Sequence, residues 1–93
     1  MISLSARPRL ASKVCLRFDG RTGRDWLLYP ERGLELNQTA ARIARLCTGG
    51  QTVGEIAQRL TAMSEGASSG AVERGVRRFL NALAARGLLQ DRP

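Results

Sequence analysis

The sequence predicts an α+β fold in which a three-stranded antiparallel sheet is followed by three helices. In residues 13–19 and 34–36, apolar side chains alternate with polar ones, a period typical of half-buried strands, and residues 24–29 predict a strand with side chains partly covered on both faces. From Asn37 onward, apolar residues recur at the spacing of one face of a helix. Residues that favour turns and helix ends lie between these segments and divide each group into three.

The strands are expected at residues 13–19, 24–29 and 34–36. Leu16 and Phe18 belong to the apolar side of the first strand. The loop Asp19–Gly23 contains two glycines that can adopt the positive φ of a tight hairpin. Pro30 suits the second position of the next turn, and Gly33 is expected to be its residue with positive φ.

Capping residues mark the first two helices. Asn37 is a favourable N-cap for the first, which is expected to continue to the stop at Gly49. The second is expected from Thr52 to Met63. Thr52 and Glu55 have the spacing of a capping box, in which each side chain bonds the other residue's backbone N–H.

The third helix is expected from Ser68 or Ser69 to about Arg86, and Leu88 and Leu89 are expected to fold back onto the core. The whole order predicts one domain. The chain has 93 residues, 43% of them apolar, which is enough for one modest core.

Three segments divide the chain. The domain is expected at residues 13–89, after a flexible N-terminal arm at 1–12 and before a short tail at 90–93. Leu10 is the residue of the arm that could dock on the domain.

The charge of the chain leaves two interpretations open. Fifteen basic and eight acidic residues give a formal net charge of +7, which suits nucleic acid or an acidic protein partner. Nearly all the basic residues are arginines spread over the whole length, and GC-rich coding alone produces the same composition.

The side chains available for catalysis are few. The chain has no histidine, the commonest general base and metal ligand. Cys15 and Cys47 are far apart and are expected to be reduced thiols rather than a disulfide or ligand pair. No glycine-rich phosphate loop is evident. These observations predict a protein that is not an enzyme and holds no metal or cofactor.

The hydropathy pattern predicts a cytoplasmic protein. No apolar run reaches the length of a membrane span, so no membrane association is expected. The first seven residues also lack the apolar centre of a signal peptide.

A small sheet beside two helices joined by a short glycine turn is winged-helix-like. One function of that architecture is DNA binding, in which the third helix would read base edges with arginine and asparagine side chains. Here the sheet precedes the helices, whereas many DNA-binding winged helices have their hairpin last. DNA binding is therefore kept as the alternative function.

Four segments carry a resemblance to a known family: Arg32–Ala40, Leu46–Cys47, Thr52–Ile56 and Arg86–Leu89. Together they resemble the PqqD family of pyrroloquinoline quinone (PQQ) biosynthesis, the prototype of the precursor-peptide recognition elements. The resemblance implies a non-catalytic peptide chaperone. Such a chaperone binds the ribosomal precursor peptide PqqA and presents it to the radical S-adenosylmethionine (SAM) enzyme PqqE, with no nucleic acid involved.

The resemblance also implies where the peptide binds. It would lie as an added strand beside the third strand, in a groove shared with the third helix, because an edge strand has unpaired N–H and C=O groups. The candidate peptide-binding residues are Gly33, Leu34, Glu35, Leu36, Asn37, Val72, Gly75, Val76, Phe79 and Ala82.

Several of these residues have a simpler interpretation. Glu35 could be a solvated charge that discourages aggregation, and Gly75 and Ala82 could pack against the chain's own sheet. An unpaired strand edge also predicts a weak or conditional homodimer. The candidate residues for docking a partner form a basic face that could equally be only solvated: Arg74, Arg77 and Arg78.

Overall fold

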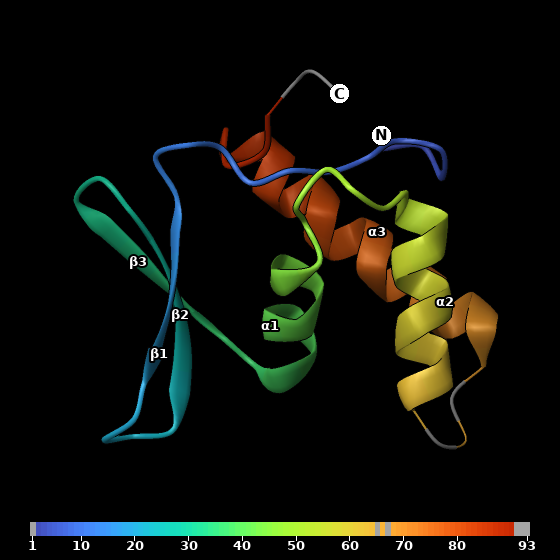
Figure 1. The fold of residues 1–93 in the computed structure, drawn as a ribbon, viewed down its shortest axis with the longest axis horizontal. Helices are drawn as coiled ribbons and strands as arrows, with labels where there is room; N and C mark the ends of the chain where they lie inside the picture. The colour runs from blue at the N-terminus through green and yellow to red at the C-terminus, as the bar shows by residue number, and fades with distance from the viewer. Residues whose placement is uncertain (1, 65, 67, 91–93) are drawn as a thin grey trace.

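The computed structural model describes residues 2–64, 66 and 68–90, so residues 91–93 of the predicted tail lie outside the described part. The sheet has the order β1-β2-β3 and is antiparallel throughout. In Figure 1, α1 lies between the sheet and the α2–α3 pair. The predicted fold class and element order are confirmed. The elements are β1 (Cys15–Asp19), β2 (Arg24–Tyr29), β3 (Arg32–Leu36), α1 (Gln38–Arg45), α2 (Val53–Met63) and α3 (Ser69–Ala85).

The turn between β2 and β3 differs from the sequence prediction. Tyr29 pairs with Arg32, so only Pro30 and Glu31 connect the strands. Glu31 has the positive φ, at 64°, and the expectation that Gly33 would have it was wrong. The reason is that β3 begins two residues earlier than predicted, which places Gly33 inside the extended strand.

The helix caps follow local chemistry. The Asn37 side chain accepts a hydrogen bond from the Ala40 N–H at 2.8 Å. Thr52 and Glu55 form the predicted capping box. Within this box the Thr52 N–H donates to the Glu55 carboxylate at 2.7 Å, and this hydrogen bond lowers the pKa of the Glu55 carboxyl from its ordinary value. The C-terminal end of α1 differs from the prediction, because the helix ends at Arg45 rather than continuing to Gly49.

One core joins the sheet to all three helices. Leu27 from β2, Ile43 from α1, Ile56 from α2 and Leu80 from α3 are among its buried side chains. Leu88 is also fully buried, which confirms the predicted fold-back after α3. The inner face of the sheet is therefore the face that meets the helices.

The N-terminal residues run along the helices in the structure. The Gly54 N–H donates to the Leu4 carbonyl at 3.0 Å, and the Val53 N–H donates to the Ala6 carbonyl at 2.9 Å. These bonds satisfy donors of the first turn of α2 that have no partner within the helix. Leu10 packs against the core and bridges to Leu89. Flexibility of this arm in solution stays a prediction.

The two cysteines are free and differ in environment. Cys15 is exposed on β1, whereas Cys47 is buried just after α1, and its thiol donates to the Ile43 carbonyl at 3.2 Å. Burial raises the pKa of Cys47 to about 12, so this thiol stays protonated at neutral pH.

Across residues 2–64, 66 and 68–90, no helix combines the length and apolar character needed to cross a membrane.

Removing the capping box of α2 should lower the stability of the domain measurably. Thr52→Ala removes the acceptor for the Glu55 N–H and should lower the free energy of unfolding by about 1 kcal/mol, as measured by urea denaturation. Gln58→Ala, at an exposed position of the same helix, should change it by less than about 0.5 kcal/mol. Equal effects of the two changes would contradict a role for the cap.

Candidate functional site

One edge of β3 is open. Among residues 2–64, 66 and 68–90, only β2 pairs with this strand. The turn brings Tyr29 and Arg32 together as the hydrogen-bonded pair that closes the hairpin, and hydrogen-bonded pairs then alternate along an antiparallel ladder. The backbone N–H and C=O groups of Gly33 and Glu35 therefore point away from β2. We call these groups the free edge.

The side chains of β3 point to two different faces. Leu34 and Leu36 face the helices, and Leu36 is buried, so it contributes only backbone to a surface. Gly33 and Glu35 lie on the opposite face, which we call the outer face of the sheet. Glu35 forms a 3.3 Å ion pair with Arg24. Both side chains are about half exposed, so this pair contributes little to stability.

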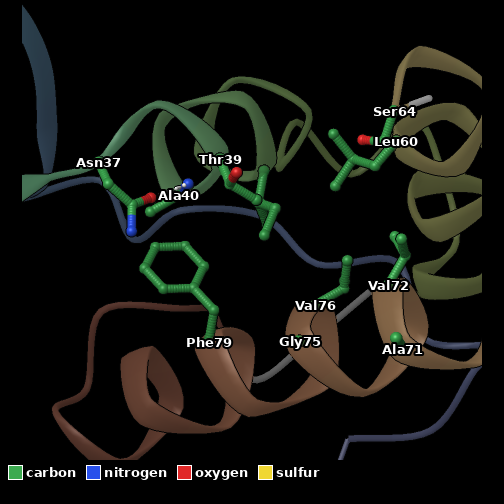
Figure 2. Close-up of a pocket in the computed structure, with 11 residues that line it drawn as sticks. Asn37, Thr39, Ala40, Leu60, Ser64, Ala71, Val72, Gly75, Val76 and Phe79 are labelled. Carbon is green, nitrogen blue, oxygen red and sulfur yellow. Dashed lines mark hydrogen bonds between the residues drawn. The ribbon is translucent and has the colours of Figure 1, made fainter. Parts of the chain in front are cut away.

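A cavity begins where β3 ends. It has a volume of about 370 Å³ and lies between α1, the end of α2 and α3. None of the described residues that line it is charged, and most are apolar. We call it the apolar cavity; its lining residues, drawn in Figure 2, are Asn37, Thr39, Ala40, Ile43, Leu60, Ser64, Ala71, Val72, Gly75, Val76 and Phe79.

The cavity has a polar group at Asn37 and open space at Gly75. Figure 2 shows the Phe79 ring of α3 opposite Asn37 and Ala40. The Asn37 oxygen already accepts from the Ala40 N–H, which leaves its amide N–H groups to donate to a ligand. At Gly75, an added Cβ would meet no described atom within 4 Å, so the wall is open there. The arrangement can accept an apolar side chain and orient it with one polar group.

The structure brings part of the predicted site together. Among the predicted binding residues, five line the apolar cavity, and Gly33, Leu34 and Glu35 lie along β3 beside it. Ala82 is exposed farther along α3 and does not line the cavity. The five that meet in the cavity are Asn37, Val72, Gly75, Val76 and Phe79.

Sequence reasoning missed the walls that α1 and α2 contribute. Ala40, Ile43 and Leu60 belong to the predicted apolar stripes, and those stripes predict only that their residues face the interior. Thr39 and Ser64 complete the rim. A periodic pattern shows which side of each helix is buried, but it does not show that a cavity remains between α1 and α3.

The three candidate docking arginines do not lie together. Arg74 and Arg78 are exposed on α3. Arg77 is half-buried, and its Nη2 donates to the Ile2 carbonyl at 3.2 Å, while Nη1 lies 3.8 Å from Glu73. The N-terminal residues therefore cover the flank of α3 on which Arg77 lies.

The residues also limit metal chemistry. In the described part of the chain, no group of three or more His, Cys, Asp or Glu side chains is arranged to hold a metal ion.

A three-stranded antiparallel sheet followed by three helices is the fold that this chain shares with a recognition element for ribosomally synthesised and post-translationally modified peptides (RiPPs). The structure superposes with a TM-score of 0.82 and 34% identity on one such element, the stand-alone PqqD truncation of Methylobacterium extorquens PqqCD. The match covers 97% of this chain and 95% of the other. The family model for PqqD, coenzyme PQQ synthesis protein D, matches residues 26–89, and the chain belongs to this family. The resemblance seen in the sequence is confirmed.

Two further structures share the fold and contain a peptide. TbiB1 in complex with the TbiA(beta) leader peptide has a TM-score of 0.76 at 25% identity, covering 91% of this chain and 98% of the other. Lasso peptide synthetase B1 with its leader peptide has a TM-score of 0.77 at 25% identity, covering 91% and 99%.

A curated relative shows the same domain within a longer protein. The bifunctional coenzyme PQQ synthesis protein C/D of Methylorubrum extorquens is 43% identical over 53 residues, which is 57% of this chain. The matched region spans 14% of that relative's length.

Proposed function

We propose that this domain is a non-catalytic peptide chaperone. It binds the ribosomal precursor peptide PqqA as an extended strand and presents it to the radical SAM enzyme PqqE in PQQ biosynthesis. The observation that carries the proposal is the free edge of β3 beside an apolar cavity with no charged residue in its described lining.

The physical basis is strand addition. Gly33 and Glu35 each offer an N–H and a C=O to an extended peptide, which gives affinity independent of the peptide's sequence. Beyond Asn37, an apolar side chain of the peptide enters the cavity and packs against the α3 wall at Val76 and Phe79, which gives selectivity. The two related structures solved with leader peptides support peptide binding by a domain of this fold.

The other predicted residues have smaller parts in this proposal. Leu34 faces the same side as the cavity, the buried Leu36 holds the strand in place, and Ala82 continues the flank of small residues on α3. The chain supplies binding alone and needs no cofactor of its own. The proposal places it in the cytoplasm, where ribosomes make the precursor.

Titration of the ¹⁵N-labelled domain with PqqA tests the proposal. Amide shifts should concentrate at Gly33, Glu35 and Asn37 and along residues 72–82, because these groups form the free edge and the cavity wall. A duplex DNA oligonucleotide should cause no shifts. If DNA shifts α3 and the peptide shifts nothing, the DNA-binding alternative is correct.

A matched pair of variants separates binding from folding. Gly75→Leu places a side chain in open space at the cavity wall, so the helix should keep its stability while peptide affinity falls about tenfold or more. Ala85→Leu makes a similar addition at an exposed position of the same helix and should bind as the wild type. Equal affinity of the two variants would contradict a role for the cavity.

We also propose that Arg74 and Arg78 dock an acidic surface of PqqE. Reversing both to Glu should slow association about tenfold at low salt, because charges at an interface act mainly on the rate of encounter. Arg59→Glu, at an exposed position of α2, is the control and should have a smaller effect. Stopped-flow association rates that do not depend on these residues at any ionic strength would leave them as solvated charges.

A weak or conditional homodimer is part of the proposal, because a second copy can pair with the same free edge. The peptide and the second copy then compete. Sedimentation should show the dimer fraction falling as PqqA is added. A tight dimer that still binds one peptide per chain would show that the two do not share this edge.

A further inference from the structure

The outer face of the sheet has an apolar surface at the free edge. Cys15, Leu28 and Gly33 lie opposite one another on the three strands. An added Cβ at Gly33 would stand 3.1 Å from Leu28 Cδ2 and 3.6 Å from Trp26 Cε3. Because glycine has no side chain there, Leu28 and Trp26 reach over β3 toward the open edge.

This surface is separate from the apolar cavity. Neither Trp26 nor Leu28 lines the cavity, and both are only partly buried. Their neighbour Leu27 points to the other face and is fully buried against the helices. Figure 1 shows α1 on that inner side. Half-buried aromatic and aliphatic groups therefore remain accessible on the face away from the helices.

A strand added to β3 must bring a side chain to this surface. Alternate residues of any extended peptide point to the outer face, and one of them lies beside Gly33. Side chains on neighbouring strands interact when their Cβ atoms are about 5 Å apart. Since Gly33 offers no side chain to meet it, the peptide residue contacts Leu28 and Trp26 instead. An aromatic side chain packed over a glycine of the neighbouring strand is a known stabilising pair.

The next outward position of β3 is different. Glu35 lies two residues farther along, opposite Trp26 in the register, and its carboxylate forms an ion pair with Arg24 on the same face. A peptide residue beside Glu35 therefore meets the charged Glu35 side chain, which separates it from Trp26, whereas the residue beside Gly33 meets the carbon atoms of Leu28 and Trp26 directly.

We propose that Gly33, Leu28 and Trp26 form a second side-chain subsite, which selects an aromatic or branched aliphatic residue of the bound peptide on the outer face. The subsite rests on the proposed function, because it needs a peptide strand at β3. The domain then reads its peptide on both faces of the sheet: one apolar residue in the cavity and another over Gly33. The outward residue two positions away, beside Glu35, is polar.

The intrinsic fluorescence of Trp26 tests this subsite directly, because the chain has one tryptophan. A tryptophan-free form of the precursor peptide PqqA is added, and binding is measured independently by calorimetry. At saturation the Trp26 emission should shift to shorter wavelength, since the peptide side chain displaces water from the indole. Calorimetric binding with unchanged emission would overturn the subsite and leave the proposed function standing. No binding by calorimetry would overturn both.

Variants on one cross-strand row give the second arm. Leu28→Ala should weaken peptide binding about fivefold, the upper range for one cross-strand pair. Cys15→Ala is the matched control, because it lies on the same row and face but on the strand farthest from the edge, and it should bind as the wild type. Equal affinities of the two folded variants would overturn the subsite.

A serine scan of the peptide keeps the test valid if Leu28→Ala is unstable. One outward position should lose about fivefold in affinity for the wild type and should lose the Trp26 shift as well. In a folded Leu28→Ala variant the same serine change should cost less, as expected for two side chains in contact. A scan in which no position changes the Trp26 emission would overturn the subsite.

Discussion

The direct passage from β3 into α1 through Asn37 is the constraint on which the site depends. Asn37 ends the strand and caps the helix, with its side-chain oxygen 2.8 Å from the Ala40 N–H. No loop separates the two elements, so the register of the sheet determines where α1 begins. Since α1 supplies one wall of the apolar cavity, the same residue also determines how far that cavity lies from the free edge. The free edge and the apolar cavity are thereby held next to each other by a single residue.

An open strand edge lowers solubility, because its unpaired N–H and C=O groups can bind any other extended chain. The structure limits this risk without closing the edge. β3 has five residues, and the exposed Glu35 places a charge beside its free backbone groups. The two-residue turn at Pro30 and Glu31 also ends the strand, and with it the free edge, at Arg32. A short, charged edge disfavours nonspecific pairing and still leaves enough donors and acceptors for one peptide, provided that side chains add selectivity.

Local chemistry explains which features the sequence could predict. The Asn37 cap and the Thr52 capping box depend on residues within four positions of each other, and both appear as expected. The features that could not be predicted depend on distant partners. Arg77 is held by the carbonyl of Ile2, 75 positions away, so its place on a helical wheel does not describe its surroundings. The α1 and α2 walls of the cavity likewise result from how the helices pack, because an apolar stripe indicates burial without indicating how completely neighbouring stripes meet.

The charge distribution separates two tasks on one helix. The chain carries a formal charge of +7, yet none of the described residues lining the cavity is charged. In the proposed mode, backbone hydrogen bonds at the free edge and apolar contact in the cavity hold the peptide, and salt screens neither of them much. Arg74 and Arg78 are exposed on α3, while Gly75 and Phe79, the next residue in each case, line the cavity. Because adjacent helical residues point in different directions, a bound peptide leaves these arginines uncovered. One helix thus lines the cavity on one side and exposes positive charge on another, which is the separation that the proposed presentation of a peptide to an enzyme requires.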